Sequence, residues 1–163
     1  MKFLTRPLSL VTVASLALFF ANCGGDGGGG SAKEKTQLKK LSGTWEILSA
    51  DLQGDDRIDD FTGFTLTISG TYDSDSPEGP YQYSVSGSKP TPSPWPASGN
   101  WSFSTAGKDQ GLILRDAGTD DETPMSYKIL SNGNLVLTIS VPDGSEGWRT
   151  KEVSGDWTFT FTQ

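Results

Sequence analysis

The sequence predicts an all-β domain, folded as an antiparallel up-and-down β-barrel of about eight strands. Three observations support this fold class: short segments alternate between apolar and polar residues, turn-rich stretches separate them, and long helix-forming runs are nearly absent. A barrel closes on itself and so leaves no sheet edge exposed. A two-sheet β-sandwich gives the same one-sided alternation, and it remains the alternative fold.

The predicted strands are the segments that carry this alternation. They are residues 44–50, 64–70, 81–87, 100–105, 111–116, 124–130, 134–141 and 154–163. Period-2 alternation places the large apolar side chains on one face, which we expect to form the interior; in residues 111–116 these are Leu112 and Leu114. A transmembrane barrel would need strands of about 9–11 residues, and most of these segments are shorter.

The connections between the strands contain turn and loop residues. Asn132-Gly133 predicts a tight hairpin, because both residues tolerate positive φ. Residues 89–96, KPTPSPWP, cannot form an interior strand because proline has no N–H to donate, so we expect an extended loop. Its Trp95 is expected to fold back over the barrel mouth, with a sugar- or partner-binding platform as the alternative. Residues 32–41 are the only segment in which we expect a helix.

The first residues are typical of an export signal. In residues 1–22, Lys2 and Arg6 precede an apolar run that has the length of a signal-peptide core and is too short to span a bilayer as a helix. The run stops at Cys23, the only cysteine of the chain. This arrangement resembles a bacterial lipoprotein signal. The resemblance implies that Cys23 carries acyl chains such as palmitate and anchors the protein in a membrane; a secreted protein with a free thiol is the alternative.

The chain then divides into a tether and a domain. Residues 23–37 are rich in glycine and are predicted to form a flexible tether, and residues 38–163 form the barrel domain. Gly24, rather than Asp, follows the cysteine, and by resemblance to lipoprotein sorting this implies the outer membrane of a bacterial envelope.

The mature chain is acidic. Removing residues 1–22 from the 163-residue chain leaves 141 residues, and the loss of Lys2 and Arg6 takes the formal charge from −7 to −9. A chain with this charge repels nucleic acid and anionic lipid. We therefore expect no nucleic-acid partner, and we expect the membrane to be contacted only through the acylated cysteine.

The start of the domain supports a family resemblance. Residues 38–48, LKKLSGTWEIL, resemble the opening of a lipocalin, in which a short helical turn is followed by Gly-x-Trp, here Gly43 and Trp45. With the strand count and order, the domain is similar to bacterial lipocalin-like lipoproteins. The resemblance implies a ligand-binding barrel in which Trp45 closes one end and packs against a basic side chain. Arg149 and Lys151 are the candidates for that side chain, although neither lies on the predicted last strand.

The residues that usually carry catalysis are missing. The chain has no histidine, and its one thiol is assigned to the anchor, so nucleophilic triads and zinc sites are not expected. A pair of carboxylates could serve a glycosidase, but nearly all Asp and Glu residues fall in predicted turns. We therefore expect no enzyme and no cofactor.

Two groups of residues are candidate binding sites. The inward-facing aromatic residues of the predicted barrel are Tyr81, Tyr83, Trp101, Tyr127 and Trp157. They could line a ligand cavity, or they could form part of a filled core, and the sequence does not decide between these two.

The acidic loop gives a weaker hypothesis, a calcium site. Its candidate ligands are Asp55, Asp56, Asp59 and Asp60. A solvated acidic loop is the favoured interpretation, because no acidic stretch has the EF-hand spacing.

The expected function follows from the resemblance. We expect a lipid-anchored, extracytoplasmic, non-catalytic protein that binds a small apolar or amphipathic ligand. The alternative is an envelope structural or interaction module with a filled core, which would bind a protein or polysaccharide through loops such as residues 51–60 and 88–98.

Overall fold

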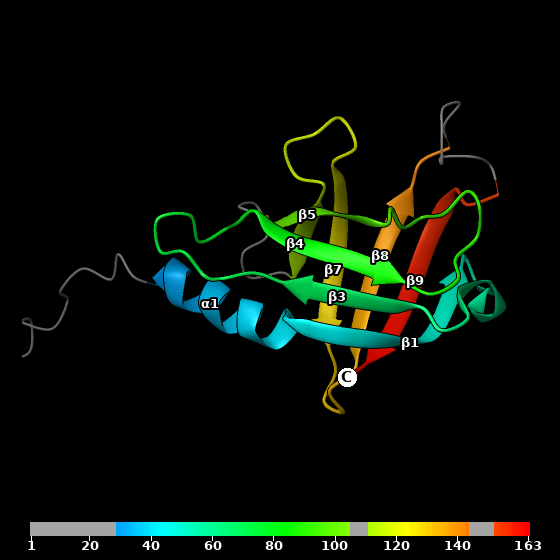
Figure 1. The fold of residues 1–163 in the computed structure, drawn as a ribbon, viewed down its shortest axis with the longest axis horizontal. Coiled ribbons are helices and arrows are strands. Elements are labelled where there is room, and N and C mark those ends of the chain that lie inside the picture. Colours follow the sequence, from blue (N-terminus) through cyan, green and yellow to red (C-terminus); the bar gives the residue numbers. More distant parts are fainter. Residues whose placement is uncertain (1–28, 105–110, 144–151) are drawn as a thin grey trace, which may run out of the picture.

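The structure is a computed structural model that describes residues 29–104, 111–143 and 152–163 (Figure 1). Its elements in chain order are α1 (Gly29–Leu41), β1 (Gly43–Leu52), β2 (Asp55–Asp56), the 3-10 helix η1 (Ile58–Phe61), β3 (Thr65–Ser69), β4 (Tyr81–Ser86), β5 (Ser98–Phe103), β6 (Leu112–Arg115), β7 (Thr123–Ile129), β8 (Leu135–Val141) and β9 (Gly155–Thr162). Each predicted strand is present, with bounds within two residues of those expected. The short elements β2 and η1 were not predicted.

The strands form a closed antiparallel barrel. From β3 to β9 each strand pairs with the next one in the chain, β1 pairs with β3, and an additional β1–β9 pairing joins the two ends of the sheet. The extra strand β2 pairs only with β1. Figure 1 shows β1, β3 and β4 in front, crossing β7, β8 and β9 behind at a steep angle. This closure confirms the predicted up-and-down barrel over the two-sheet sandwich, and it is consistent with a lipocalin-like barrel.

The helix is longer than predicted, and it shortens the expected tether. α1 begins at Gly29, so the part of residues 23–37 that the structure describes is helical and not a flexible coil. Two features explain the helix. Residues 32–41 are mostly strong helix formers, and Leu38 and Leu41 are buried against the barrel. Tertiary burial of one helix face therefore overrides the flexibility that glycine confers at the start.

The Gly-x-Trp sequence sits at the junction of α1 and β1. Trp45 is buried, and its indole Nε1 donates a hydrogen bond to the Leu41 carbonyl oxygen at 2.8 Å. Trp45 thereby ties the first strand to the end of the helix. The basic side chains expected to pack on it, Arg149 and Lys151, lie outside the described residues.

Gly43 is required by the backbone at this junction. Its φ of +142° is one that L side chains rarely adopt, and a Cβ atom there would collide with the Gln163 amide group. That amide donates from Nε2 to the Ser42 carbonyl oxygen at 3.3 Å, so the chain end lies across the start of β1.

One strand turns the opposite face to the interior from the one predicted. In β6, Ile113 and Arg115 are buried, whereas Leu112 and Leu114 are only partly buried. The register explains this, since Arg115 lies opposite Trp101, which also points inward, and directly paired residues share a face. The expectation that Leu112 and Leu114 form the inner face is therefore wrong, and a charged side chain lies inside the barrel.

A bulge interrupts the alternation of β1. The pairing with β9 shifts between Ile47 and Ser49, which leaves Leu48 on the outside at 50% exposure. Beyond the bulge, Ala50 is the next residue that faces the interior, and it is buried. Within the described residues, Leu48 is the one large apolar side chain that is exposed.

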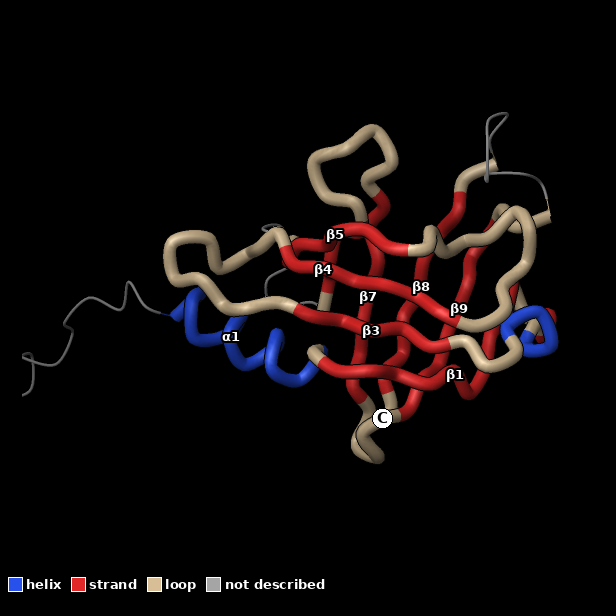
Figure 2. The backbone as a smooth tube through the Cα atoms, in the orientation of Figure 1, coloured by secondary structure: helices blue, strands red, loops and turns tan. Residues whose placement is uncertain are grey.

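The two ends of the barrel are closed differently. Figure 2 shows α1 at one end and η1 at the other, with the strands between them. At the η1 end, the buried Phe61 packs edge-on against Phe64, Trp157 and Phe159, with ring centroids 5.4–5.8 Å apart. The loop between β4 and β5, residues 87–97, closes the same end, because the Ser88 N–H donates to the carbonyl oxygen of the neighbouring Thr62. We call residues 87–97 the mouth loop.

Candidate functional site

The candidate site lies where the mouth loop enters the barrel. Trp95 of this loop is only 1% exposed, and its ring lies 5.5 Å from that of Phe159 and 6.2 Å from those of Tyr83 and Phe64. The expectation that Trp95 folds back over the mouth as packing is therefore confirmed. Its indole Nε1 is buried and has no hydrogen-bond partner among the residues that the structure describes.

Two cationic side chains hold the mouth loop by its carbonyl groups. Arg115 Nη1 donates to the Pro94 carbonyl oxygen at 2.6 Å, and Lys89 Nζ donates to the Trp95 carbonyl oxygen at 2.6 Å. The guanidinium carbon also lies 5.8 Å from the centre of the Trp95 ring, a cation–π contact. Burial lowers the pKa of Lys89. The loop thus presents a carbonyl oxygen and an indole ring to the inside of the barrel.

Arg115 is fully buried at 0% exposure and has fixed partners on the barrel. Its Nη2 donates to Thr123 Oγ1 at 3.3 Å, and its Nε lies 3.2 Å from Asp116 Oδ2 in an ion pair. A buried charge needs such partners, because leaving water costs several kcal/mol. Asp116 therefore balances the guanidinium charge inside the site, and this pair keeps Arg115 in place.

Tyr83 links Asp116 to the cavity. Its hydroxyl donates to the Asp116 carboxylate at 3.3 Å. Burial raises the pKa of the Tyr83 phenol, the Arg115 guanidinium opposes that rise, and the Asp116 carboxylate adds to it. Gly99 of β5 lies opposite Tyr83 in the register, and a Cβ atom at Gly99 would collide with the Asp116 carboxylate and the Tyr83 ring. Glycine at this position lets the phenol reach across β5.

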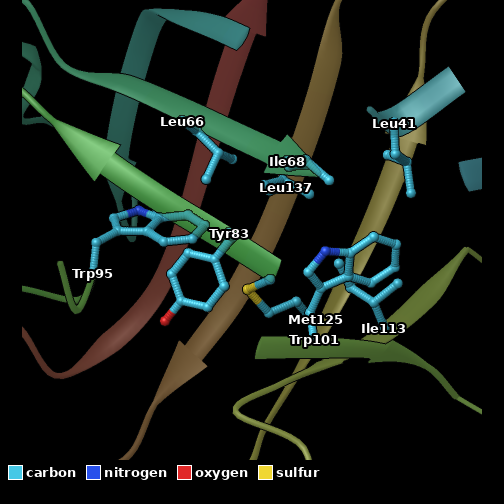
Figure 3. A pocket seen from close by; sticks show the side chains of 9 residues that line it. All are labelled: Leu41, Leu66, Ile68, Tyr83, Trp95, Trp101, Ile113, Met125 and Leu137. Atoms are coloured by element: carbon cyan, nitrogen blue, oxygen red, sulfur yellow. The ribbon is translucent and has the colours of Figure 1, made fainter. Parts of the chain in front are cut away.

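Beneath Trp95 the barrel is almost filled. A cavity of about 10 Å³ is lined by Leu41, Leu66, Ile68, Tyr83, Trp95, Trp101, Ile113, Met125 and Leu137 (Figure 3). Figure 3 shows Trp95 at one end of this group and Leu41 at the other. A volume of this size holds about one water molecule, and its lining is apolar. The cavity has no room for an organic ligand.

The five aromatic residues predicted to line a ligand cavity are only partly brought together. Tyr83 and Trp101 line the cavity. Tyr81 packs against Trp101 at 4.9 Å and donates to the Pro77 carbonyl oxygen, nearer to α1. Trp157 stacks on Phe159.

Tyr127, the fifth of these residues, is partly buried and is not among the lining residues. Sequence reasoning missed Arg115 and Asp116 at this site. The available signal was the charge in GLILRD, residues 111–116, which interrupts the apolar alternation.

The end of the barrel near α1 contains a second unusual group. Glu34 of α1 is 3% exposed, and neither of its carboxylate oxygens has a hydrogen-bond partner among the described residues. The Tyr72 hydroxyl is likewise buried without a partner in that part of the chain. Burial first and then, among smaller causes, the Glu34 charge raise the pKa values of Tyr81 and Tyr127.

The outer face of the barrel carries a polar recess. Its volume is about 430 Å³, and it is lined by Ser69, Gln82, Tyr83, Ser84, Ser98, Gly99 and Asn100 of β3, β4 and β5. The side-chain oxygen Asn100 Oδ1 is buried there, with no hydrogen-bond partner within the described residues. Hydroxyl and amide groups gathered in this way can bind a polar, uncharged ligand.

The acidic loop does not gather its carboxylates into a calcium site. Asp56 Oδ1 accepts from the Ile58 N–H, and Asp60 pairs with Arg57. Asp55 and Asp59 are exposed. Across the described ranges, no group of three or more His, Cys, Asp or Glu residues could hold a metal ion. Asp56 and Asp60 instead order the turn and the short helix η1.

Cys23, the residue expected to carry the acyl chains, lies outside the described residues. In the part of the chain that is described, no helix is long and apolar enough to cross a membrane. Comparison with known proteins found no matching family model, no matching curated protein and no matching solved structure.

Proposed function

We propose that this protein is a lipid-anchored, extracytoplasmic, lipocalin-like barrel that binds a small apolar or amphipathic molecule without catalysis. The ligand takes the space that the Trp95 side chain occupies in this structure, which we call the closed conformation.

One observation carries the proposal: the side chain that fills this end of the barrel comes from a loop and not from a strand. The mouth loop holds Trp95 in place through side-chain hydrogen bonds to two carbonyl groups. Moving the loop outward therefore opens a cavity without breaking the β1–β9 closure or any other strand pairing of the barrel. The buried indole N–H of Trp95 also has no hydrogen-bond partner among the described residues, so Trp95 leaves one buried polar group unsatisfied there.

The energetics favour a closed resting state that a ligand can open. A buried tryptophan removes about 150–250 Å² from water, which at about 25 cal/mol per Å² stabilises the closed form by about 4–6 kcal/mol. Solvation of the orphaned N–H on opening returns about 1–3 kcal/mol. The open form is therefore a minor population, and a ligand of similar apolar area offsets its cost.

Native mass spectrometry of the full chain, extracted gently from membranes, tests the proposal. We expect an extra mass that leaves on unfolding, or binding of added apolar compounds that is stronger in Trp95→Ala than in the wild type, because the variant no longer has to expel the indole. The control is Trp157→Ala, which removes a buried tryptophan that belongs to β9 and packs against η1 instead of belonging to the mouth loop. A bare mass in all three proteins after challenge with apolar compounds would overturn the proposal.

The anchor is tested separately by Cys23→Ala. We expect this variant to leave the membrane fraction, whereas the control Ser31→Ala remains there, because only the cysteine carries the acyl chains. Persistence of Cys23→Ala in washed membranes would contradict the anchor without bearing on the cavity.

The polar recess favours a second candidate function, an envelope interaction module with a filled core. In this case the recess on β3, β4 and β5 would bind a polysaccharide. Titration with neutral oligosaccharides, followed by NMR, would shift the resonances of Gln82 and Asn100, and Asn100→Ala would weaken the effect.

A further inference from the structure

The mouth loop occupies the barrel in the way that a ligand would. It inserts an apolar body, the Trp95 indole, together with a hydrogen-bond acceptor, the Pro94 carbonyl oxygen. The acceptor lies 2.6 Å from Arg115 Nη1, and the same guanidinium faces the indole ring. The chemistry of this internal occupant therefore indicates the chemistry of the molecule that replaces it.

The guanidinium keeps its orientation when the loop moves. Its Nε and Nη2 are held by Asp116 and by Thr123, both of which belong to the β6–β7 region and not to the mouth loop. Nη1 therefore continues to point at the position that the Pro94 oxygen now fills. An incoming molecule that offers an oxygen at that position regains the hydrogen bond, and one that offers only carbon loses it.

The charge of the site decides which oxygen it accepts. Asp116, with a side chain 15% exposed, already balances Arg115, and the present occupant of Nη1 is a neutral carbonyl. Lys89 is part of the mouth loop and donates to the loop's own carbonyl, so it leaves with the loop. A carboxylate would bring a second negative charge into a desolvated site that holds one cation, at a cost of several kcal/mol.

Resting on the proposed function, we infer that the ligand is a neutral amphiphile. It has an apolar body of about the size of an indole ring and an ester-, amide- or ketone-type carbonyl oxygen that replaces the Pro94 oxygen on Arg115. The adjoining cavity of about 10 Å³ lets the body be slightly larger than the indole that it displaces.

The test compares a neutral ester with the carboxylate anion of the same parent acid. The probes are methyl indole-3-propionate and indole-3-propionate, titrated calorimetrically into the full chain carrying Trp95→Ala. We expect the ester to bind at least tenfold more tightly than the acid. Asp116→Asn in the same background removes the balancing charge but keeps an oxygen for Arg115 Nε and for the Tyr83 hydroxyl. It is expected to shift the ester-to-acid affinity ratio at least tenfold toward the acid.

The outcomes separate this inference from the function on which it rests. Equal binding of ester and acid, or an unchanged ratio in Asp116→Asn, would overturn the neutral-ligand inference while leaving ligand binding intact. Binding of neither probe to folded Trp95→Ala, verified by circular dichroism, would overturn both. If Trp95→Ala does not fold, the same pair is titrated into the wild type at higher concentration. Ester-selective binding there, accompanied by increased proteolysis of residues 87–97, supports the inference, and no ester preference contradicts it.

Discussion

The two buried tryptophans near the mouth give a direct measure of how well Trp95 fits its place. Trp95 and Trp157 are both almost completely buried, at 1% and 0% exposure. Trp157 Nε1 donates to the Val153 carbonyl oxygen at 2.8 Å, whereas Trp95 Nε1 has no partner among the described residues. Replacing each with phenylalanine removes the same ring volume and the same N–H group. The two substitutions therefore differ mainly in the hydrogen bond that is lost.

The expected difference can be worked out from these contacts. Trp157→Phe breaks a buried hydrogen bond and leaves the Val153 carbonyl without that donor, which costs about 1–3 kcal/mol beyond the lost packing. Trp95→Phe removes a buried N–H that makes no hydrogen bond to any described residue, which relieves a penalty of about 1–3 kcal/mol. Trp157→Phe should therefore destabilise the fold by about 2–6 kcal/mol more than Trp95→Phe.

Urea unfolding followed by far-ultraviolet circular dichroism is the appropriate assay, since fluorescence would change with the loss of either indole. With an m-value of about 2 kcal/mol per M, the unfolding midpoints of the two variants should lie about 1–3 M apart. An unchanged m-value would show that both variants unfold from the same compact state. Equal midpoints would refute the reasoning, because they would mean that the Trp95 N–H is as well satisfied as that of Trp157.

Three further predictions follow from the buried polar groups and from Gly99. Glu34→Gln should raise the free energy of unfolding by about 1–2 kcal/mol, because it replaces a buried carboxylate without described hydrogen-bond partners by a neutral amide. The control Glu46→Gln, at an exposed position of β1, should leave the free energy of unfolding unchanged. A loss of stability in Glu34→Gln would contradict this account. Because burial raises the pKa of the Tyr83 phenol above its ordinary 10.0, this group stays protonated in the folded chain while the unfolded chain ionises. The free energy of unfolding should therefore fall as the pH rises above about 10. Urea midpoints measured between about pH 8 and about pH 11 should fall less steeply with pH in Tyr83→Phe than in the wild type. Identical slopes in the two proteins would argue against a buried phenol. Gly99→Ala should lower the free energy of unfolding by at least about 2 kcal/mol, since its Cβ would collide with the Asp116 carboxylate and the Tyr83 ring. The control Gly118→Ala has open space around its Cβ but a φ of +77°, and it should lower the free energy by only about 1 kcal/mol in thermal or urea unfolding. Similar losses in the two variants would show that the contact at Gly99 is easily relieved.

The strand order and bounds could be predicted from the sequence because period-2 alternation and turn residues are local signals. The tight turn at Asn132-Gly133 joins β7 and β8, as predicted. The alternation failed in β6, where Leu112, Ile113 and Leu114 are all apolar, so both phases of the pattern were available. There the cross-strand register selected the inner face, and register is a property of the assembled sheet.

The sequence by itself determined the all-β class, the number of main strands, the position of the helix and the proline-rich segment that cannot be a strand. Only the tertiary structure decided that Arg115 lies inside the barrel, that Trp95 fills its mouth and that little space remains between them. The physical reason is that alternation reports which face of a strand is apolar, whereas a buried charge or a loop-borne side chain depends on partners far away in the chain. The burial of Arg115 depends on hydrogen bonds from its guanidinium to the Pro94 carbonyl oxygen, to Thr123 and to Asp116. The sequence pattern around residue 115 does not indicate these contacts, because Pro94 lies in a separate loop.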